Sequence, residues 1–216
     1  MALTQYTDLL PDVLSHVMAC PRPQILRALQ TQSSYFFQES QAYTHPVVET
    51  VDPGVSTITV ADLPEQTRLV APLDMQIDGQ PLSTTNQQIM TNKYGNYLAE
   101  EDRNPEYVFA TNHMTNMLTV VPMIRANGVS GEITGLIAIK PIRLASGMEE
   151  TIMEEFADGI VSGALSKLFM VKNSEWYDPN LSMEYKAEFE RAILKAKQAR
   201  MKGNTSLMLT TGYGGY

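Results

Sequence analysis

The sequence predicts an α+β fold: a helical bundle from N- and C-terminal helices, with an inserted small antiparallel β domain and an extended C-terminal tail. Apolar residues recur every three or four positions near both ends of the chain, which is typical of helices packed on a core. Between them the period shortens to two, and β-branched residues and turn dipeptides accumulate. These patterns divide the chain into N-terminal helices (residues 1–45), a β-rich insertion (46–144), C-terminal helices (145–202) and a tail (203–216).

Composition limits the function classes. The chain has 216 residues, 44% of them hydrophobic, so it can bury a sizeable core. Its 16 Lys and Arg residues against 24 Asp and Glu residues give a net charge of −8, which argues against a general nucleic-acid binder. The single cysteine, Cys20, excludes an intrachain disulfide and a cysteine-based metal cage. The longest apolar helix candidate, residues 152–171, carries charged side chains that argue against a membrane span.

Prolines delimit the N-terminal helices. Pro11 suits the first turn of a short helix that runs to about Met18. Pro21 and Pro23 interrupt that helix and begin a second one. Its mostly apolar stripe consists of Ile25, Leu26, Leu29, Gln32, Tyr35, Phe36 and Ser40.

The β-rich insertion contains several short candidate strands. They span residues 55–60, 67–77, 106–110, 117–124 and 132–140, and they favour a small antiparallel sandwich or barrel. The dipeptides Asp78-Gly79 and Asn127-Gly128 predict hairpin turns. Residues 80–104 are polar and poorly periodic, so we expect a long polar loop there.

The C-terminal helices are predicted over residues 149–171 and 182–201. Gly159 and Gly163 lie four positions apart in the first of them, and each costs about 1 kcal/mol relative to alanine. Close approach of a neighbouring helix would explain that cost. Trp176 lies in the connecting loop, and Tyr185 and Phe189 share one face of the last helix. We expect these five residues to pack the subunit.

The sequence contains no constellation that supports an enzyme, a cofactor site or a metal site. His16 precedes Cys20 by one helical turn, so a catalytic Cys–His pair is conceivable, but Pro21 interrupts the helix directly afterwards. Four glutamates between residues 149 and 155 sit at a predicted helix N-terminus, where the helix dipole favours negative charge. Lys93, beside Tyr94, and Arg103 could contact nucleic acid, although the net charge favours ordinary surface charges.

Ordered motifs at both ends of the chain carry a family resemblance. The C-terminal ones are Met-Glu-Glu-Thr-Ile-Met-Glu-Glu-Phe (148–156), Ile-Val-Ser-Gly-Ala-Leu-Ser-Lys-Leu (160–168), Glu-Trp-Tyr-Asp-Pro (175–179) and Tyr-Lys-Ala-Glu-Phe (185–189). Upstream stand Leu-Leu-Pro-Asp-Val-Leu (9–14), Cys-Pro-Arg-Pro-Gln (20–24), Phe-Phe-Gln-Glu-Ser (36–40) and Ile-Ala-Ile-Lys-Pro (137–141). Together they resemble the head-to-tail adaptor, or connector, family of tailed bacteriophages. Residues 104–107 resemble its Pro-x-x-Tyr element, but the polar segment before them has no counterpart in that family.

The resemblance implies a non-enzymatic structural protein of the virion, assembled in the host cytoplasm. It would form a dodecameric ring between the portal protein and a tail or nozzle protein, without membrane contact. Double-stranded DNA would pass through the ring at ejection without sequence-specific binding, and Lys93 or Arg103 would line the channel or face the tail. The uncharged tail would be a strap that binds the portal. Its anchors would be Leu207, Met208, Leu209, Tyr213 and Tyr216.

Other readings of the sequence remain open. The chain could be another ring component of the tail, such as a terminator, a nozzle or a tube-associated protein. It could also be a non-viral helical interaction module or a hydrolase that depends on Cys20. The position of the protein along the tail axis of a virion would distinguish the first of these from an adaptor.

Overall fold

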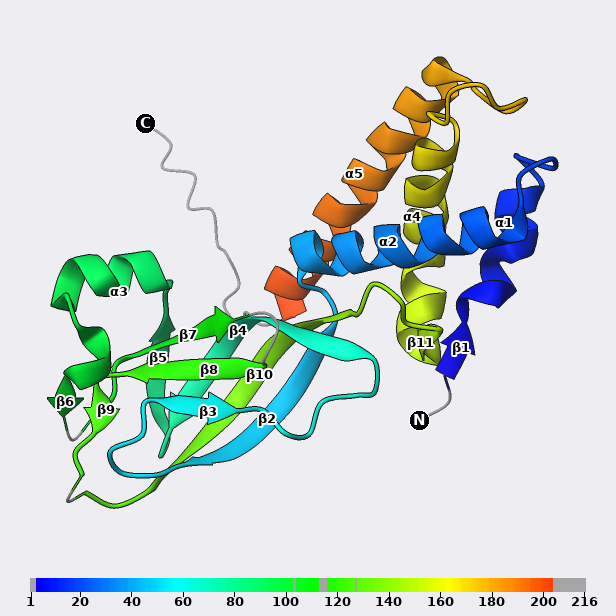
Figure 1. Cartoon of the computed structure of the whole chain (residues 1–216). Coiled ribbons are helices and arrows are strands. Elements are labelled where there is room, and N and C mark those ends of the chain that lie inside the picture. The colour runs from blue at the N-terminus through cyan, green and yellow to red at the C-terminus, as the bar shows by residue number, and fades with distance from the viewer. Residues whose placement is uncertain (1–2, 103, 113–115, 127, 204–216) are drawn as a thin grey trace, which may run out of the picture.

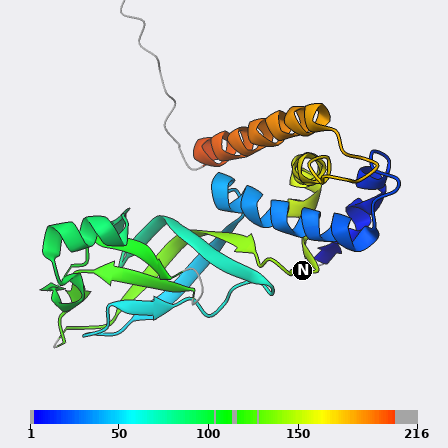
Figure 2. The same cartoon turned by 45° about the horizontal axis from the view of Figure 1, so that its top comes forward.

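A computed structural model gives the fold and describes residues 3–102, 104–112, 116–126 and 128–203. A β half (residues 44–141) and a helical half (residues 3–40 and 147–203) lie side by side (Figures 1 and 2). The expectation of a helical bundle with a small antiparallel insertion is wrong. The fold is mixed α/β, and a seven-stranded sheet dominates the described residues.

The large sheet is mixed and runs in the order β2-β10-β4-β5-β7-β8-β3. Its strands are β2 (Thr44–Val51), β3 (Thr57–Thr59), β4 (Thr67–Ile77), β5 (Gln80–Thr84), β7 (Tyr107–Asn112), β8 (Met117–Val121) and β10 (Gly131–Pro141). Strands β5 and β7 pair in parallel, and the other neighbours are antiparallel. A parallel pair needs a crossover, which the segment between these two strands supplies.

That crossover occupies most of the predicted long polar loop, so the loop expectation is also wrong. It contains α3 (Gln87–Tyr94), the short 3-10 helix η2 (Tyr97–Ala99) and β6 (Glu101–Asp102), which pairs with β9 (Met123–Ile124). The Asn86 side chain caps α3 by accepting a hydrogen bond from the backbone N–H of Ile89 at 2.9 Å. Met90, Tyr97, Phe109 and Val121 form a small separate core beneath this crossover.

The sheet curls until its two edges lie close together. The His45 ring Nε2 lies 2.6 Å from the carbonyl oxygen of Asp62, and the Ala61 backbone N–H donates to the Glu49 carboxylate at 3.0 Å. These bonds join edge strand β2 to the segment that follows β3, the opposite edge strand. Figure 1 shows the two strands next to each other. Such lateral bonds protect a sheet edge from pairing with other chains.

The long helices of the other half are α2 (Arg22–Ser40), α4 (Glu150–Leu168) and α5 (Pro179–Gly203). Figure 1 shows α2 crossing α4, with α5 alongside. The short elements η1 (Tyr6–Leu9) and α1 (Leu10–Leu14) lie beside them, and β1 (Leu3–Gln5) pairs with β11 (Gly147–Glu149) just before α4. The helices do not close into a bundle because α2 is shared with the sheet, where the Gln38 side chain accepts a hydrogen bond from Lys140 of β10 at 2.7 Å.

Aromatic side chains unite the two halves in a single core. Phe36 lies 5.4 Å from Phe156 and 5.9 Å from Phe189, measured between ring centroids. Phe37 lies 5.6 Å from Tyr43, at the entrance to β2, and 5.5 Å from Phe156. Aromatic pairs at these distances contribute about 0.5–1.5 kcal/mol beyond the area they bury. The sheet and the helices are therefore held together by α2.

We predict that Gly163→Ala lowers the free energy of unfolding by about 2 kcal/mol, because overpacking a filled core outweighs the gain in helix propensity. A Cβ at residue 163 would lie 2.6 Å from a ring carbon of Phe189. Gly159→Ala is the matched control, since its nearest contact would be Ala192 at 3.0 Å, and we expect a smaller loss. Urea denaturation measures both, and equal stability of the three proteins would contradict this packing.

Candidate interaction surface

The predicted packing residues meet at the contact between α4 and α5. Gly163 lies opposite Phe189, and Gly159 lies opposite Ala192 and Phe36. The two glycines leave a shallow strip on α4 in which the side chains of α5 sit. This contact fixes the spacing of α4 and α5 and therefore the shape of the surface between α5 and α2.

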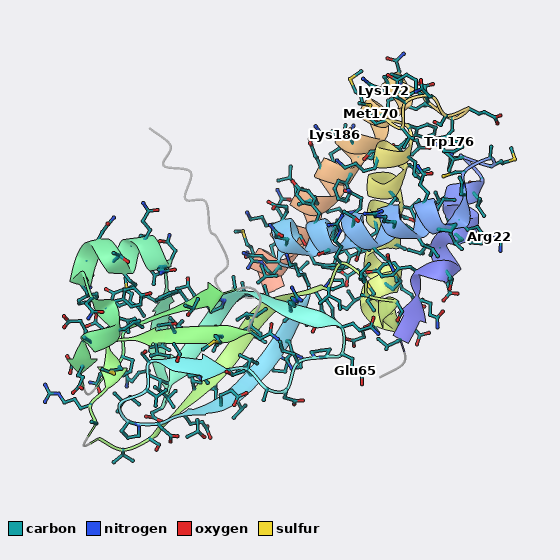
Figure 3. All side chains as sticks on the ribbon, in the orientation of Figure 1. Arg22, Glu65, Met170, Lys172, Trp176 and Lys186 are labelled. Carbon is teal, nitrogen blue, oxygen red and sulfur yellow. The ribbon has the colours of Figure 1, made fainter. Side chains whose placement is uncertain are left out.

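The turn between α4 and α5 is held by Trp176 and Asp178. The indole N–H of Trp176 donates to the carbonyl oxygen of Leu168 at 3.1 Å. The Asp178 carboxylate accepts from the backbone N–H groups of Asn180 and Leu181 at 2.9 and 3.1 Å, which caps the first turn of α5. Figure 3 shows Trp176 at the end of the helical half that also carries Met170.

The aromatic ring of Tyr185 stacks on Phe169, which directly follows α4. Their centroids are 5.7 Å apart and their planes differ by 11°. Trp176, in the loop between the helices, and Tyr185 and Phe189, on α5, therefore all hold α5 against α4. The motif residues at positions 160–189 build this one helical hairpin.

An open groove of about 1050 Å³ runs between α2 and α5, with the end of α4 at its base. Phe189 and Ile193 form a buried floor, while Tyr35, Met170, Met183 and Leu194 line it with exposed apolar surface. We call this the α2–α5 groove. Its remaining lining residues are Thr31, Gln32, Glu39, Ser166, Lys167, Ser182, Lys186 and Glu190.

Four of the polar residues that line the α2–α5 groove have partners within the protein. The Ser182 hydroxyl donates to the carbonyl oxygen of Ser166, and the Ser166 hydroxyl donates to that of Gly163, both at 2.7 Å. At the rim, the Lys186 amino group lies 3.8 Å from the Glu190 carboxylate. The groove therefore offers mainly apolar contact. Contiguous exposed apolar surface of this kind marks interaction sites on soluble proteins.

Sequence reasoning missed this groove. The sequence predicts Tyr35 on the apolar stripe of its helix. In the structure its ring stacks on Phe189, with 6.1 Å between the ring centroids, and the residue is half exposed. Met183 and Leu194 fall outside the predicted apolar face of the last helix. The available signal was a second apolar set on that helix, which a single-stripe interpretation leaves unused.

The conceivable Cys20–His16 pair is not formed. Cys20 is 4% exposed, and its thiol lies near the carbonyl oxygen of Pro21. The His16 ring instead lies 3.2 Å from the Tyr185 hydroxyl, through Nδ1. Burial raises the pKa of the Cys20 thiol, which disfavours the thiolate that a nucleophile needs.

Lys93 is held in place by two tyrosine rings. Its amino group donates to the Tyr107 hydroxyl at 2.7 Å and lies 4.3 and 4.8 Å from the ring centroids of Tyr107 and Tyr94. The Glu106 carboxylate is 3.9 Å away. The hydrogen bonds to Tyr107 and then Tyr94 raise the pKa of Lys93, so it stays positively charged. That Lys93 lines a DNA channel or faces the tail stays a prediction.

Arg103 and the strap anchors lie outside the described residues. The anchors are Leu207, Met208, Leu209, Tyr213 and Tyr216.

Comparison of the sequence with known protein families and with curated proteins finds no match. Within the ranges that the structure describes, no three His, Cys, Asp or Glu side chains gather as metal ligands would. Nor does any helix in those ranges combine the length and hydropathy needed to cross a membrane.

We predict that Trp176→Ala destabilises the subunit by about 3 kcal/mol, through lost aromatic packing at the α4–α5 turn. Trp176→Phe retains much of the packing but loses the bond to Leu168, so it should cost only about 1 kcal/mol. Thermal and urea denaturation compare the three proteins. A melting curve unchanged by Trp176→Ala would show that the turn does not depend on this side chain.

We also predict that the Cys20 thiol reacts with a disulfide reagent such as DTNB at least about 100-fold more slowly in the native protein than in 8 M urea. Burial and the raised thiol pKa are the physical reasons. Absorbance of the released thiolate gives the rate. Equal rates in the two conditions would point to a reactive cysteine and revive the hydrolase hypothesis.

Proposed function

We propose that this protein is the structural subunit of a head-to-tail adaptor ring in a tailed bacteriophage, located between portal and tail, with a central passage for DNA. The α2–α5 groove carries the proposal, because its exposed apolar surface fits a protein that works by contacting other subunits. The uncharged C-terminal sequence adds a second apolar element, which the family resemblance assigns to portal binding.

The energetics favour burial of the groove in an assembly. Covering the half-exposed Tyr35, Met170, Met183 and Leu194 stabilises a contact by on the order of 4 kcal/mol at the usual value per unit area. One such contact is too weak for a stable complex once the entropy of association is included. A closed ring repeats the contact around its circumference, so many weak contacts together stabilise one assembly.

The net charge is compatible with a DNA conduit. A net charge of −8 disfavours lasting attachment of a polyanion to the ring. In this proposal the helical half contacts portal and neighbouring subunits, and the β half extends toward the tail component or the outside of the ring. Lys93, fixed between its two tyrosines, is then a candidate for a single defined contact with DNA or with the tail.

The test is reconstitution with the purified portal protein of the same virus. We expect electron microscopy and native mass spectrometry to find a dodecameric ring bound to portal. Met183→Glu combined with Leu194→Glu should weaken ring formation at least about tenfold, because charges enter an apolar contact. Val129→Glu, at an even more exposed apolar residue of the β half, is the control and should have no effect.

Two results would contradict the proposal. A chain that ends at Lys202 should lose portal binding, and binding as tight as that of the full chain would rule out the strap. A portal that recruits no ring of this protein, under conditions in which it binds other head-completion proteins, would rule out the adaptor function itself.

A further inference from the structure

The outward side of α5 carries a second apolar stripe. Met183 and Leu194 are 63 and 59% exposed, and Ala187 between them is partly buried. With Glu190, these residues follow one another at intervals of four, three and four positions, so they lie on one face of the helix. We call this set the α5 seam. The face that packs against α4 is a different one, and it carries Phe189.

The spacing of the α5 seam is that of a coiled coil. Positions that alternate three and four residues apart form the contact between the two helices of such a pair. Within the described chain, α5 packs against α4 and α2 through its other face. Figure 2 shows α5 along the upper edge of the helical half. The seam is therefore available to a helix of another molecule.

The order of charges along α5 favours a second copy of the same helix in the opposite direction. The acidic side chains of α5 all lie in its first half, at Glu184, Glu188 and Glu190. From Arg191 to Lys202 every charged side chain is basic. Two antiparallel copies place the acidic half of each helix beside the basic half of the other, whereas a parallel pair would place like charges together.

One antiparallel register, centred on the middle of the α5 seam, suits both its apolar and its charged residues. Met183 then lies opposite Leu194 of the second copy, and Ala187 lies opposite Glu190 of the second copy. The Lys186 amino group, which lies 3.8 Å from the Glu190 carboxylate of its own chain, comes beside Glu190 of the second copy as well. Each contact occurs twice, because a two-fold axis makes the same surface face itself.

We propose that the isolated protein forms a two-fold dimer in which α5 of a second copy lies antiparallel along the α5 seam. Met183 and Leu194 supply the apolar layers at the two ends of the contact. In the middle, the small side chain of Ala187 leaves room for Glu190 of the second copy, and the two Lys186 amino groups balance the two carboxylates. One pair of helices buries less area than a standard interface, so the dimer is weak and reversible.

The dimer and the proposed ring exclude each other. Met183, Glu190 and Leu194 belong to the α5 seam and also line the α2–α5 groove, so one copy cannot hold a two-fold partner and a ring neighbour there at once. Free subunits would then be stored as dimers and would not close into rings before the portal recruits them. This consequence rests on the proposed function, whereas the dimer itself does not.

Disulfide trapping between two copies tests the antiparallel register. On a Cys20→Ser background, one chain carries Met183→Cys, the other carries Leu194→Cys, and the two are mixed without portal. We expect a covalent dimer to form at least about tenfold faster in the mixture than in either chain alone, because the same residue of two copies lies roughly 16 Å apart along the helix axis, too far for a disulfide. Non-reducing gels and mass spectrometry identify the product. Equal rates in the mixture and in the separate chains would overturn the proposal.

Charge reversal in the full chain gives a second measurement, by sedimentation equilibrium over about 1 μM to 1 mM protein. Lys186→Glu and Glu190→Lys should each weaken the dimer at least about tenfold, because like charges then meet across the two-fold axis. An equimolar mixture of the two variants should recover the dimer, since opposite charges meet again in the mixed pair. Arg125→Glu makes the same change of charge as Lys186→Glu at an exposed residue of the β half, and it should leave the dimer unchanged.

Three results of this measurement would contradict the proposal. The first is a monomer throughout the concentration range. The second is a species larger than a dimer, which would assign the α5 seam to a ring contact. The third is a mixture of the two charge variants that stays monomeric. Both experiments omit the portal, so a failure of the adaptor function would not affect their outcome.

Discussion

Phe36 and Phe37 determine how the two halves of the molecule are joined. Consecutive positions on a helix point about 100° apart, so the two rings serve different neighbours. Phe36 contacts Phe189 of α5, Phe37 contacts Tyr43 before β2, and both contact Phe156 of α4. These contacts bury the sides of α2 that carry Phe36 and Phe37. The side that carries Tyr35 stays partly exposed and lines the groove beside α5. The groove is therefore a consequence of how α2 is shared between helices and sheet.

Sequence patterns identified the elements whose faces are strongly apolar. The predicted strand at residues 67–77 is β4, and the predicted second and last helices correspond to α2 and α5. The sequence did not predict β5 and the crossover helix α3, because each buries few side chains. Leu82 is the buried residue of β5, and Met90 is the buried residue of α3. Residues of such elements are mostly polar, so they resemble a loop. The extent of the sheet and its parallel pair depend on contacts between distant strands, which local periodicity does not contain.

Part of the candidate surface could also be predicted from the sequence, and part could not. Glycine at positions 159 and 163 was informative in the sequence because a costly residue in a helix needs a compensating contact, and each faces a neighbouring helix. The groove was not predictable, since the exposure of Met183 and Leu194 depends on what α2 leaves uncovered. Likewise, Tyr94 is next to Lys93 in the sequence, whereas Tyr107 is fourteen residues away and contacts Lys93 because the crossover brings α3 close to β7.

One helix both lines the groove and leads into the C-terminal segment. If an outside partner pulls on that segment along the axis of α5, the load passes through the backbone hydrogen bonds that link successive turns of the helix. The Phe189 ring packs against Gly163, so it would sterically oppose sliding of α5 past α4. Mechanical load on the end of the chain would thus be passed to the contact between α4 and α5.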